Sequence, residues 1–285
     1  MRKTTIFAFL LAAVALLAQQ TGVFAVLKST VLLGKHAGGI YLVSTNQLLS
    51  PWGEQTVIPG RPVDMAWDSQ RRFLAVLNTR GIVLLDGSTG IKLADIETRS
   101  TSYTGIAFRP GDLQLWASET SRNGPDSILI TELSETGKPG KTSRIGLNGH
   151  PLPTGIAFSP DGRYAYVAFS RMNSLAVIDA NTAEMIKEIE VGMAPFGVAV
   201  AGNRVFVSNR GGRRAREGDT TAPSSGSQVV TDAVTGSSIS GTLSVVNAKT
   251  GDTREIMVGL APSQLAVNPK ARCSPWPTAI RTRCR

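Results

Sequence analysis

Residues 154–195 read TGIAFSPDGRYAYVAFSRMNSLAVIDANTAEMIKEIEVGMAP, and they contain the clearest copy of the pattern from which the fold is predicted. It holds four short apolar segments rich in β-branched and aromatic residues, which is the pattern of β-strands. Turns separate them at 159–163, at 173 and at 181–182. In the first turn proline sets φ and glycine accepts a positive φ. The stretch therefore predicts one antiparallel four-stranded sheet.

The same pattern recurs along the chain, and each copy begins with an alanine between two apolar residues. The central alanines are spaced 41, 50, 42 and 67 residues apart; they are Ala66, Ala107, Ala157, Ala199 and Ala266. A period near 42 residues predicts an all-β chain that forms a β-propeller of four-stranded blades. Because each blade has two apolar faces, it must pack between neighbours. We expect tryptophans at those interfaces, namely Trp52, Trp67 and Trp116.

Several segments of the repeat resemble the YVTN β-propeller repeat. They are VFVSN (205–209), GTLSVVN (241–247), TG (250–251), VG (258–259) and AP (261–262), and in the preceding repeat YVA (166–168), LAVID (175–179), VG (191–192) and AP (194–195). The resemblance covers roughly residues 60–270. It implies the propeller fold and says little about function.

A closer resemblance is to YVTN propellers that precede a phosphoesterase domain of the alkaline-phosphatase superfamily. The N-terminal segment 39–62 and the long insert from Asn209 to Gly241 carry it. Such relatives are similar to seven-bladed propellers. The phosphoesterase half has no counterpart in this sequence, so the resemblance implies a fragment of a propeller-phosphoesterase protein.

The number of repeats predicts an incomplete propeller. Full repeats are expected to start near residues 62, 103, 153 and 196, and a fifth near Gln264. Segments 40–43 and 55–58 are expected to be the last strands of a partial first blade. The propeller, 26–270, thus holds about five blades' worth of a seven-bladed parent.

Residues 1–25 have the organisation of a secretory signal peptide. Arg2 and Lys3 precede an apolar run from Ile6 to Leu17, which is 12 residues long. A membrane span needs about 20 such residues. We expect cleavage after Ala25 and a periplasmic or extracellular protein without a later membrane span. The alternative is an uncleaved N-terminal anchor.

The tail 271–285 reads ARCSPWPTAIRTRCR and lacks the alternation of a strand. It carries both cysteines of the chain, Cys273 and Cys284, and four arginines. Its codons, read one nucleotide earlier with permitted synonymous choices, can give GTVLAVANGHSDTVS, the turn and strand that the repeat requires. The hypothesis is a frameshift near codon 270, which would make the tail foreign to the fold.

The basic residues are concentrated at the two ends of the chain. The sequence has 30 Lys and Arg against 21 Asp and Glu, a formal charge of +9. The body 26–270 holds 24 basic and 21 acidic residues, a net charge of only +3. That balance is an ordinary surface and does not by itself indicate a nucleic-acid-binding protein.

The insert 210–240 is the most unusual segment and the candidate binding site. Arginine forms paired hydrogen bonds to phosphate or carboxylate, and a loop on a rigid scaffold is a common place for a site. The candidate ligand- or partner-binding residues are Asn209, Arg210, Arg213, Arg214, Arg216 and Asp219. The alternative is a solvated, mobile loop whose acids neutralise its arginines.

No catalytic residue, metal site or cofactor is expected. The two histidines, His36 and His150, have no metal-ligand spacing, and neither a Gly-x-Ser-x-Gly motif nor a phosphate-binding loop is present. The favoured function is a secreted propeller that acts as a binding or scaffold module for an unknown protein or a small anionic ligand. One alternative is a lactonase-like hydrolase with a metal in the central channel; another is nucleic-acid binding through the arginine insert.

Overall fold

The computed structural model describes residues 32–45, 47–50, 52–224, 226–268 and 280–282. The expected signal peptide and most of the tail lie outside this part. The chain divides into two compact units, Met1–Val57 and Ile58–Arg285. The described regular structure consists of β-strands and one short 3₁₀ turn, so the all-β prediction is confirmed. None of the described residues form a helix of the length and apolarity that crossing a membrane requires.

The described part of the first unit is a small sheet of three antiparallel strands in the order β1-β2-β3. Its strands are β1 (Gly34–Lys35), β2 (Tyr41–Leu42) and β3 (Leu48–Leu49), with the 3₁₀ turn Ala37–Gly39 between the first two. The strand expected at 40–43 is thus present, but 55–58 forms no strand. That expectation was wrong because the segment spans the boundary between the two units and pairs with the sheet of neither.

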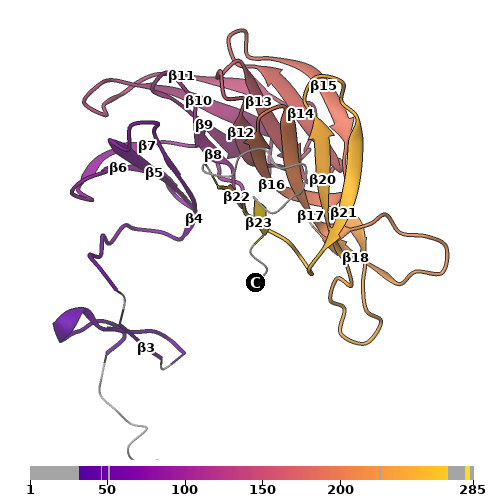
Figure 1. Cartoon of the computed structure of the whole chain (residues 1–285). Coiled ribbons are helices and arrows are strands. Elements are labelled where there is room, and N and C mark those ends of the chain that lie inside the picture. Colours follow the sequence, from indigo (N-terminus) through magenta and orange to yellow (C-terminus); the bar gives the residue numbers. More distant parts are fainter. Residues whose placement is uncertain (1–31, 46, 51, 225, 269–279, 283–285) are drawn as a thin grey trace, which may run out of the picture. The chain divides into compact units, whose positions relative to one another are not determined.

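The second unit contains four successive four-stranded antiparallel sheets, here called blades 1 to 4 (Figure 1). Blade 1 has β4 (Pro62–Trp67), β5 (Phe73–Asn78), β6 (Gly81–Asp86) and β7 (Lys92–Ile96), and blade 2 has β8 (Ile106–Phe108), β9 (Gln114–Glu119), β10 (Ser127–Leu133) and β11 (Pro139–Gly146). Blade 3 has β12 (Pro153–Phe158), β13 (Tyr164–Phe169), β14 (Ser174–Asp179) and β15 (Glu184–Glu190), and blade 4 has β16 (Met193–Ala201), β17 (Arg204–Gly212), β20 (Gly241–Asn247) and β21 (Thr253–Val258). The fold is an incomplete β-propeller, and its blades begin close to the expected residues.

Alternation along each strand supplies both faces of a blade. In β13, Ala165, Val167 and Phe169 pack in the core that blade 3 shares with blade 2. Tyr166 and Ala168 point to the other face and pack in the core shared with blade 4. A blade therefore buries its apolar residues only when it has a neighbour on each side.

Glycines at equivalent positions allow neighbouring blades to approach closely. A Cβ at Gly155 would lie 2.5 Å from the carbonyl oxygen of Phe196 in the next blade, and Gly105 and Gly197 are similarly crowded. Hydroxyl groups reinforce the contact: Ser118 Oγ donates to the Thr154 carbonyl of the next blade at 2.7 Å. The first strands of the blades (β4, β8, β12 and β16), here called the inner strands, are thus held together by backbone contact as well as by side-chain packing.

Only one of the three tryptophans behaves as expected. Trp116 is fully buried and meets Phe158 of the next blade edge-to-face, with ring centroids 5.4 Å apart. Trp52 is fully exposed and Trp67 is 45% exposed. The expectation was wrong for these two because Trp52 lies in the first unit, outside the blades, and Trp67 lies on β4, whose outward face has no preceding blade among the described strands.

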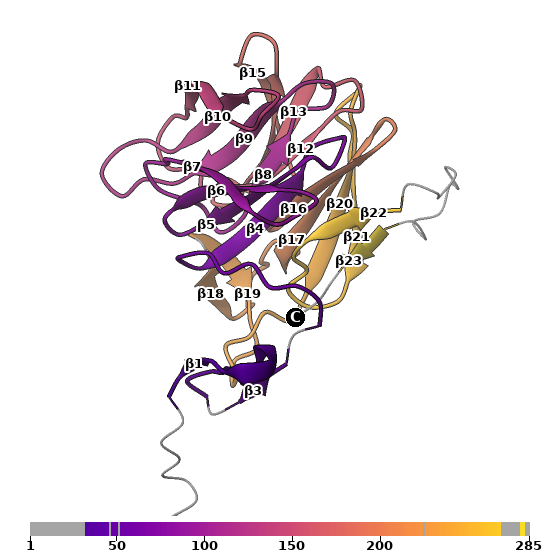
Figure 2. The same cartoon turned by 90° about the vertical axis from the view of Figure 1, so that its left-hand side faces the viewer.

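A fifth repeat begins with β22 (Leu265–Val267), close to the expected start. It pairs antiparallel with β23 (Ile280–Thr282), which comes from the tail (Figure 2). The tail lacks strand-like alternation in its sequence, yet residues 280–282 form a strand. Backbone pairing along a free strand edge does not require alternating side chains, so a segment without strand-like alternation can still pair there.

Candidate functional site

The insert between β17 and β20 folds into an antiparallel hairpin, which lies at the lower right of Figure 1. Its strands are β18 (Thr221–Ser224) and β19 (Ser227–Val230). Val229 is buried against Met193 and Ala194 of β16. The Ser227 hydroxyl donates to the Ser170 carbonyl and to Asn173 Oδ1, both at 2.9 Å. The hairpin is therefore anchored on blades 3 and 4 instead of extending freely into solvent.

Arg213 and Asp219 form a closed ion pair within the insert. Arg213 Nη1 lies 2.7 Å from Asp219 Oδ2, and Arg213 Nη2 lies 2.9 Å from Asp219 Oδ1. The backbone N–H of Arg216 also donates to Asp219, at 2.6 Å. Because these donors stabilise the ionised carboxylate, with Arg213 the largest contributor, the pKa of Asp219 falls to about 2. The pair closes the loop, and its two charges neutralise each other.

The other three arginines leave their charges largely in solvent. Arg210 lies over the ring of Phe196, with Cζ 4.8 Å from the ring centroid. Arg214 Nη2 lies 3.5 Å from Glu190, but both side chains are more than half exposed, so this ion pair contributes little free energy. Arg216 is exposed, and only its backbone engages Asp219. Arg210, Arg214 and Arg216, here called the displayed arginines, are thus the cations that the insert presents.

Asn209 is in the blade interior, away from solvent. Its side chain has no exposed surface, and Nδ2 donates to Thr242 Oγ1 at 3.0 Å and to Ser244 Oγ at 2.8 Å. Its Oδ1 has no hydrogen-bond partner among the described residues. A Cβ at Gly192 would collide with this side chain. The structure therefore places Asn209 as a packing residue beneath the insert and not beside the displayed arginines.

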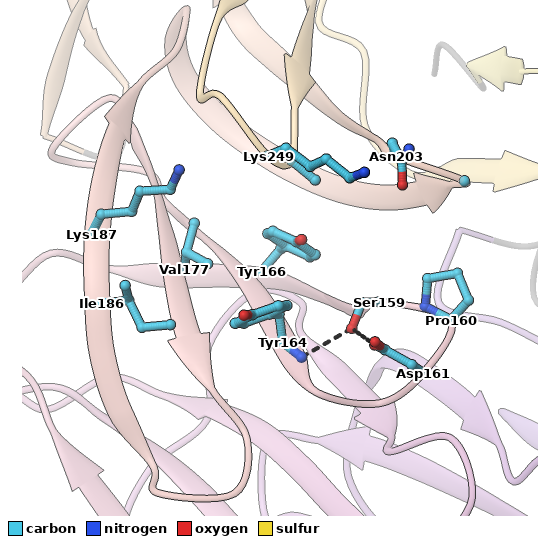
Figure 3. Close-up of a pocket in the computed structure, with 12 residues that line it drawn as sticks. Ser159, Pro160, Asp161, Tyr164, Tyr166, Val177, Ile186, Lys187, Asn203 and Lys249 are labelled. Atoms are coloured by element: carbon cyan, nitrogen blue, oxygen red, sulfur yellow. Dashed lines mark hydrogen bonds between the residues drawn. The ribbon is translucent and has the colours of Figure 1, made fainter.

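A second candidate is a hollow of about 670 Å³ between blades 3 and 4 (Figure 3). Its lining comes from five separate segments: the β12–β13 turn with β13, the strand β14, the strand β15, the β16–β17 turn, and the β20–β21 turn. Tyr164, Tyr166, Lys187 and Lys249 contribute its aromatic and basic groups. Sequence reasoning missed it because no single motif holds these residues; the available signal was two tyrosines on the same face of one strand.

A third candidate site is a hydrogen-bond network between the inner strands of neighbouring blades. Asp64 Oδ2 accepts hydrogen bonds from Thr104 Oγ1 at 2.7 Å and from the Gly105 N–H at 2.8 Å. Gln264 Nε2 donates to Thr104 Oγ1 at 2.5 Å. Blades 1 and 2 and the start of the fifth repeat thus share a network that contains one carboxylate. Within the described ranges, no group of three or more His, Cys, Asp or Glu side chains could hold a metal ion.

The histidines make local structural contacts. His150 Nδ1 lies 3.5 Å from Asp126 Oδ1, and Asp126 also accepts the N–H groups of Ser121 and Leu152. His36 Nε2 lies 2.7 Å from the Leu32 carbonyl oxygen. Both contacts are the ordinary pairing of turn residues.

Comparison with known proteins gives a likeness in fold alone. No known protein family and no curated protein matches the sequence. Among solved structures, hydrazine synthase of Kuenenia stuttgartiensis matches with a TM-score of 0.55 and 18% identity, over 77% of this chain and 56% of that one. A functionally unknown protein of Desulfotomaculum acetoxidans matches with a TM-score of 0.52 and 17% identity, over 79% of this chain and 64% of that one. A Bacteroides caccae protein of unknown function has a TM-score of 0.51 and 12% identity, over 79% and 73%.

Proposed function

We propose that the chain is a non-catalytic binding or scaffold module that contacts an anionic partner through the displayed arginines. The observation that carries the proposal is the anchored insert: Arg210 lies on β17, Arg214 and Arg216 follow within six residues, and the hairpin that comes next is fixed to blades 3 and 4. Rigid presentation favours binding because less conformational entropy is lost when the partner arrives. A protein with an acidic surface or a small anionic ligand has the matching chemistry.

The six site residues predicted from the sequence take different roles in this proposal. The displayed arginines make contact with the partner. Arg213 and Asp219 hold the loop in shape through their ion pair, and Asn209 supports the base of the insert from inside blade 4. The proposal therefore keeps the predicted segment and reassigns half of its residues from contact to support.

The same proposal includes where the protein is located in the cell and from which larger protein the chain derives. The organisation of residues 1–25 supports secretion, with cleavage after Ala25 and a periplasmic or extracellular module. The sequence resemblance supports a propeller, 26–270, that is part of a propeller-phosphoesterase protein, with the tail 271–285 arising from a frameshift. Resequencing across codons 260–285 and the following DNA tests the frameshift and the parent protein, since an extra or missing base and a downstream phosphoesterase reading frame are the expected findings.

The experiment for the binding role removes the displayed charges together. The triple variant R210Q/R214Q/R216Q is compared with R122Q/K138Q/K141Q, which removes three cations from exposed positions on blade 2. Salt elution from immobilised heparin reports binding to a polyanion. We expect the insert variant to elute at clearly lower salt than the wild type, and the control variant to elute near the wild type.

Equal shifts for the two triple variants would show that only net charge matters and would overturn the proposal. A labelled single-stranded DNA of 20 nucleotides tests the nucleic-acid alternative in the same variants, since such binding weakens steeply with salt. Tight, salt-sensitive DNA binding that the insert variant loses would favour that alternative over a protein or a small anion. The hydrolase alternative has no set of metal ligands among the described residues to support it.

A further inference from the structure

The hollow between blades 3 and 4 is separate from the arginine hairpin. Its blade 4 wall is the turn at Gly202 and Asn203, before β17, and the turn at Ala248 and Lys249, after β20. The hairpin joins the opposite ends of these same two strands. The hollow and the hairpin therefore lie at opposite ends of blade 4, and each can be altered without touching the other.

Tyr166 is the buried polar group that faces the hollow. Its side chain is only 3% exposed, yet it lines the cavity, and its hydroxyl has no hydrogen-bond partner among the residues that the structure describes. Burial, followed by the nearby Tyr164 and Asp161, raises the pKa of Tyr166. The hydroxyl therefore stays protonated at neutral pH and remains a hydrogen-bond donor. The hydroxyl oxygen is not among the fully buried polar atoms without a partner, so the hydroxyl is reachable from the hollow and free to donate to a ligand there.

Two lysines make the hollow electropositive. Lys187 comes from β15 of blade 3, and its Nζ reaches the β20–β21 turn of blade 4, since a Cβ at Gly251 would lie 3.5 Å from it. Lys249 comes from that turn. Neither ammonium group has an ion-pair partner in the described part of the chain. In Figure 3 they approach the hollow from different blades.

The single carboxylate on the lining is already engaged. Asp161 accepts hydrogen bonds from Ser159 Oγ at 2.5 Å and from the Arg163 N–H at 3.1 Å. These donors lower its pKa, the Ser159 hydroxyl most of all. The Arg163 guanidinium lies over the Tyr164 ring, 5.1 Å from its centroid. The charge left to attract a ligand is therefore positive.

Apolar side chains form much of the remaining lining, beside the polar side chains of Ser159 and Asn203. The apolar part comes from Pro160, Val177, Ile186 and Ala248, together with Tyr164. The volume is within the range of small-molecule sites, and apolar walls with a few convergent polar groups are the usual composition of such sites. The lining thus combines an apolar floor, two unpaired cations and one unpaired donor.

We propose that this hollow binds a small organic anion with an apolar body and a carboxylate. Lys187, Lys249 and the Tyr166 hydroxyl attract the carboxylate, and the apolar walls cover the body. A free carboxylic acid and the C-terminus of a short apolar peptide share this chemistry.

The test uses 4-phenylbutyrate as the probe and 4-phenylbutanamide as its neutral counterpart, measured by calorimetry on the full chain. We expect the carboxylate to bind at least tenfold more tightly than the amide. K187Q/K249Q should weaken carboxylate binding at least tenfold, and Y166F should weaken it severalfold because one hydrogen bond is lost. Acetyl-Leu-Phe with a free or an amidated C-terminus distinguishes a peptide end from a free acid as the tighter ligand.

Matched controls separate the site from general charge and folding effects. K138Q/K141Q removes two exposed lysines of blade 2, and Y103F changes a tyrosine that is 58% exposed; both should bind as the wild type does. The insert variant R210Q/R214Q/R216Q should also leave this binding unchanged, so a failure of the proposed function leaves this test intact. Equal binding of carboxylate and amide, or undiminished binding by a folded K187Q/K249Q, would overturn the proposal.

Discussion

Asp219 shows how one carboxylate can determine what a loop presents. It lies six residues after Arg213 and accepts two hydrogen bonds from that guanidinium and one from the Arg216 backbone. The ion pair removes one cation and one anion from the candidate site. What remains for a partner is the set of displayed arginines.

The direction of the Asp219 pKa shift determines how the stabilisation from this ion pair depends on pH. The pKa of Asp219 is about 2 in the folded protein, below the ordinary value of about 3.9 for an unfolded chain. A lowered folded pKa means that the stabilisation is present above about pH 4 and is lost as the pH falls towards 2.

We predict that the Asp219 carboxyl titrates in carbon-detected NMR with a midpoint near pH 2. In R213Q the midpoint should rise towards the ordinary value, since the main donor is gone. Asp232 is the internal control: its pKa is lowered by Thr235, far from Arg213 in the sequence, and should not move. A midpoint for Asp219 that R213Q leaves unchanged would contradict the assignment.

In the hairpin β18–β19, a single residue again determines how a whole segment is held. The composition of the insert, which is rich in Ser, Thr and Gly, predicts a mobile loop without regular structure. Val229 changes this because its side chain is 4% exposed and packs on Met193 and Ala194. One apolar contact and the Ser227 hydrogen bonds fix the hairpin that follows Arg214 and Arg216 in the chain.

We predict that Val229→Ala loosens the hairpin and leaves the blades folded. The loss of two buried methyl groups costs about 1.5 kcal/mol, which acts locally. Trypsin should cut after Arg214 and Arg216 several times faster in this variant than in the wild type. Val234→Ala, at a residue that is 94% exposed, is the matched control and should not change the cleavage rate. Equal cleavage rates in all three proteins would show that Val229 is not the anchor.

At the scale of the whole molecule, stability comes from the contact of blade with blade. Each shared core draws residues from two sheets, and the inner strands approach so closely that only glycine fits at some positions. Gly155 is the clearest case, because backbone atoms of Phe196 and Val198 occupy the space where its Cβ would be. Its φ is not in the left-handed region, so the constraint is close approach and not backbone conformation.

We predict that Gly155→Ala destabilises the propeller by about 1–3 kcal/mol, because the inner strand of blade 4 must move away. The thermal midpoint should fall by several degrees, measured by circular dichroism. Gly146→Ala is the matched control, since a Cβ there meets nothing within 4 Å, and its midpoint should stay near the wild type. Similar thermal midpoints for the two variants would contradict this prediction, because they would mean that moving the inner strand of blade 4 away does not destabilise the protein.

The candidate sites were predictable to different degrees for a physical reason. The arginines of the insert are close in sequence and were found from it. The burial of Asn209 and the pairing of Arg213 with Asp219 depend on how the loop closes, so composition could not show them. The hollow was missed because its walls come from two blades whose residues are up to 90 positions apart, as Ser159 and Lys249 are.

The strands of blades 1 to 4, their order and the four-stranded blade follow from the sequence alone, because alternation and turn residues act over a few neighbours and recur with each repeat. It also placed the insert and its cations. Other features became visible only in the folded chain: which faces are covered, why Trp116 is buried while Trp67 is not, that the tail supplies a partner for β22, and that a hollow opens between blades 3 and 4. These features depend on contacts between residues far apart in the chain, and a local pattern carries no information about them.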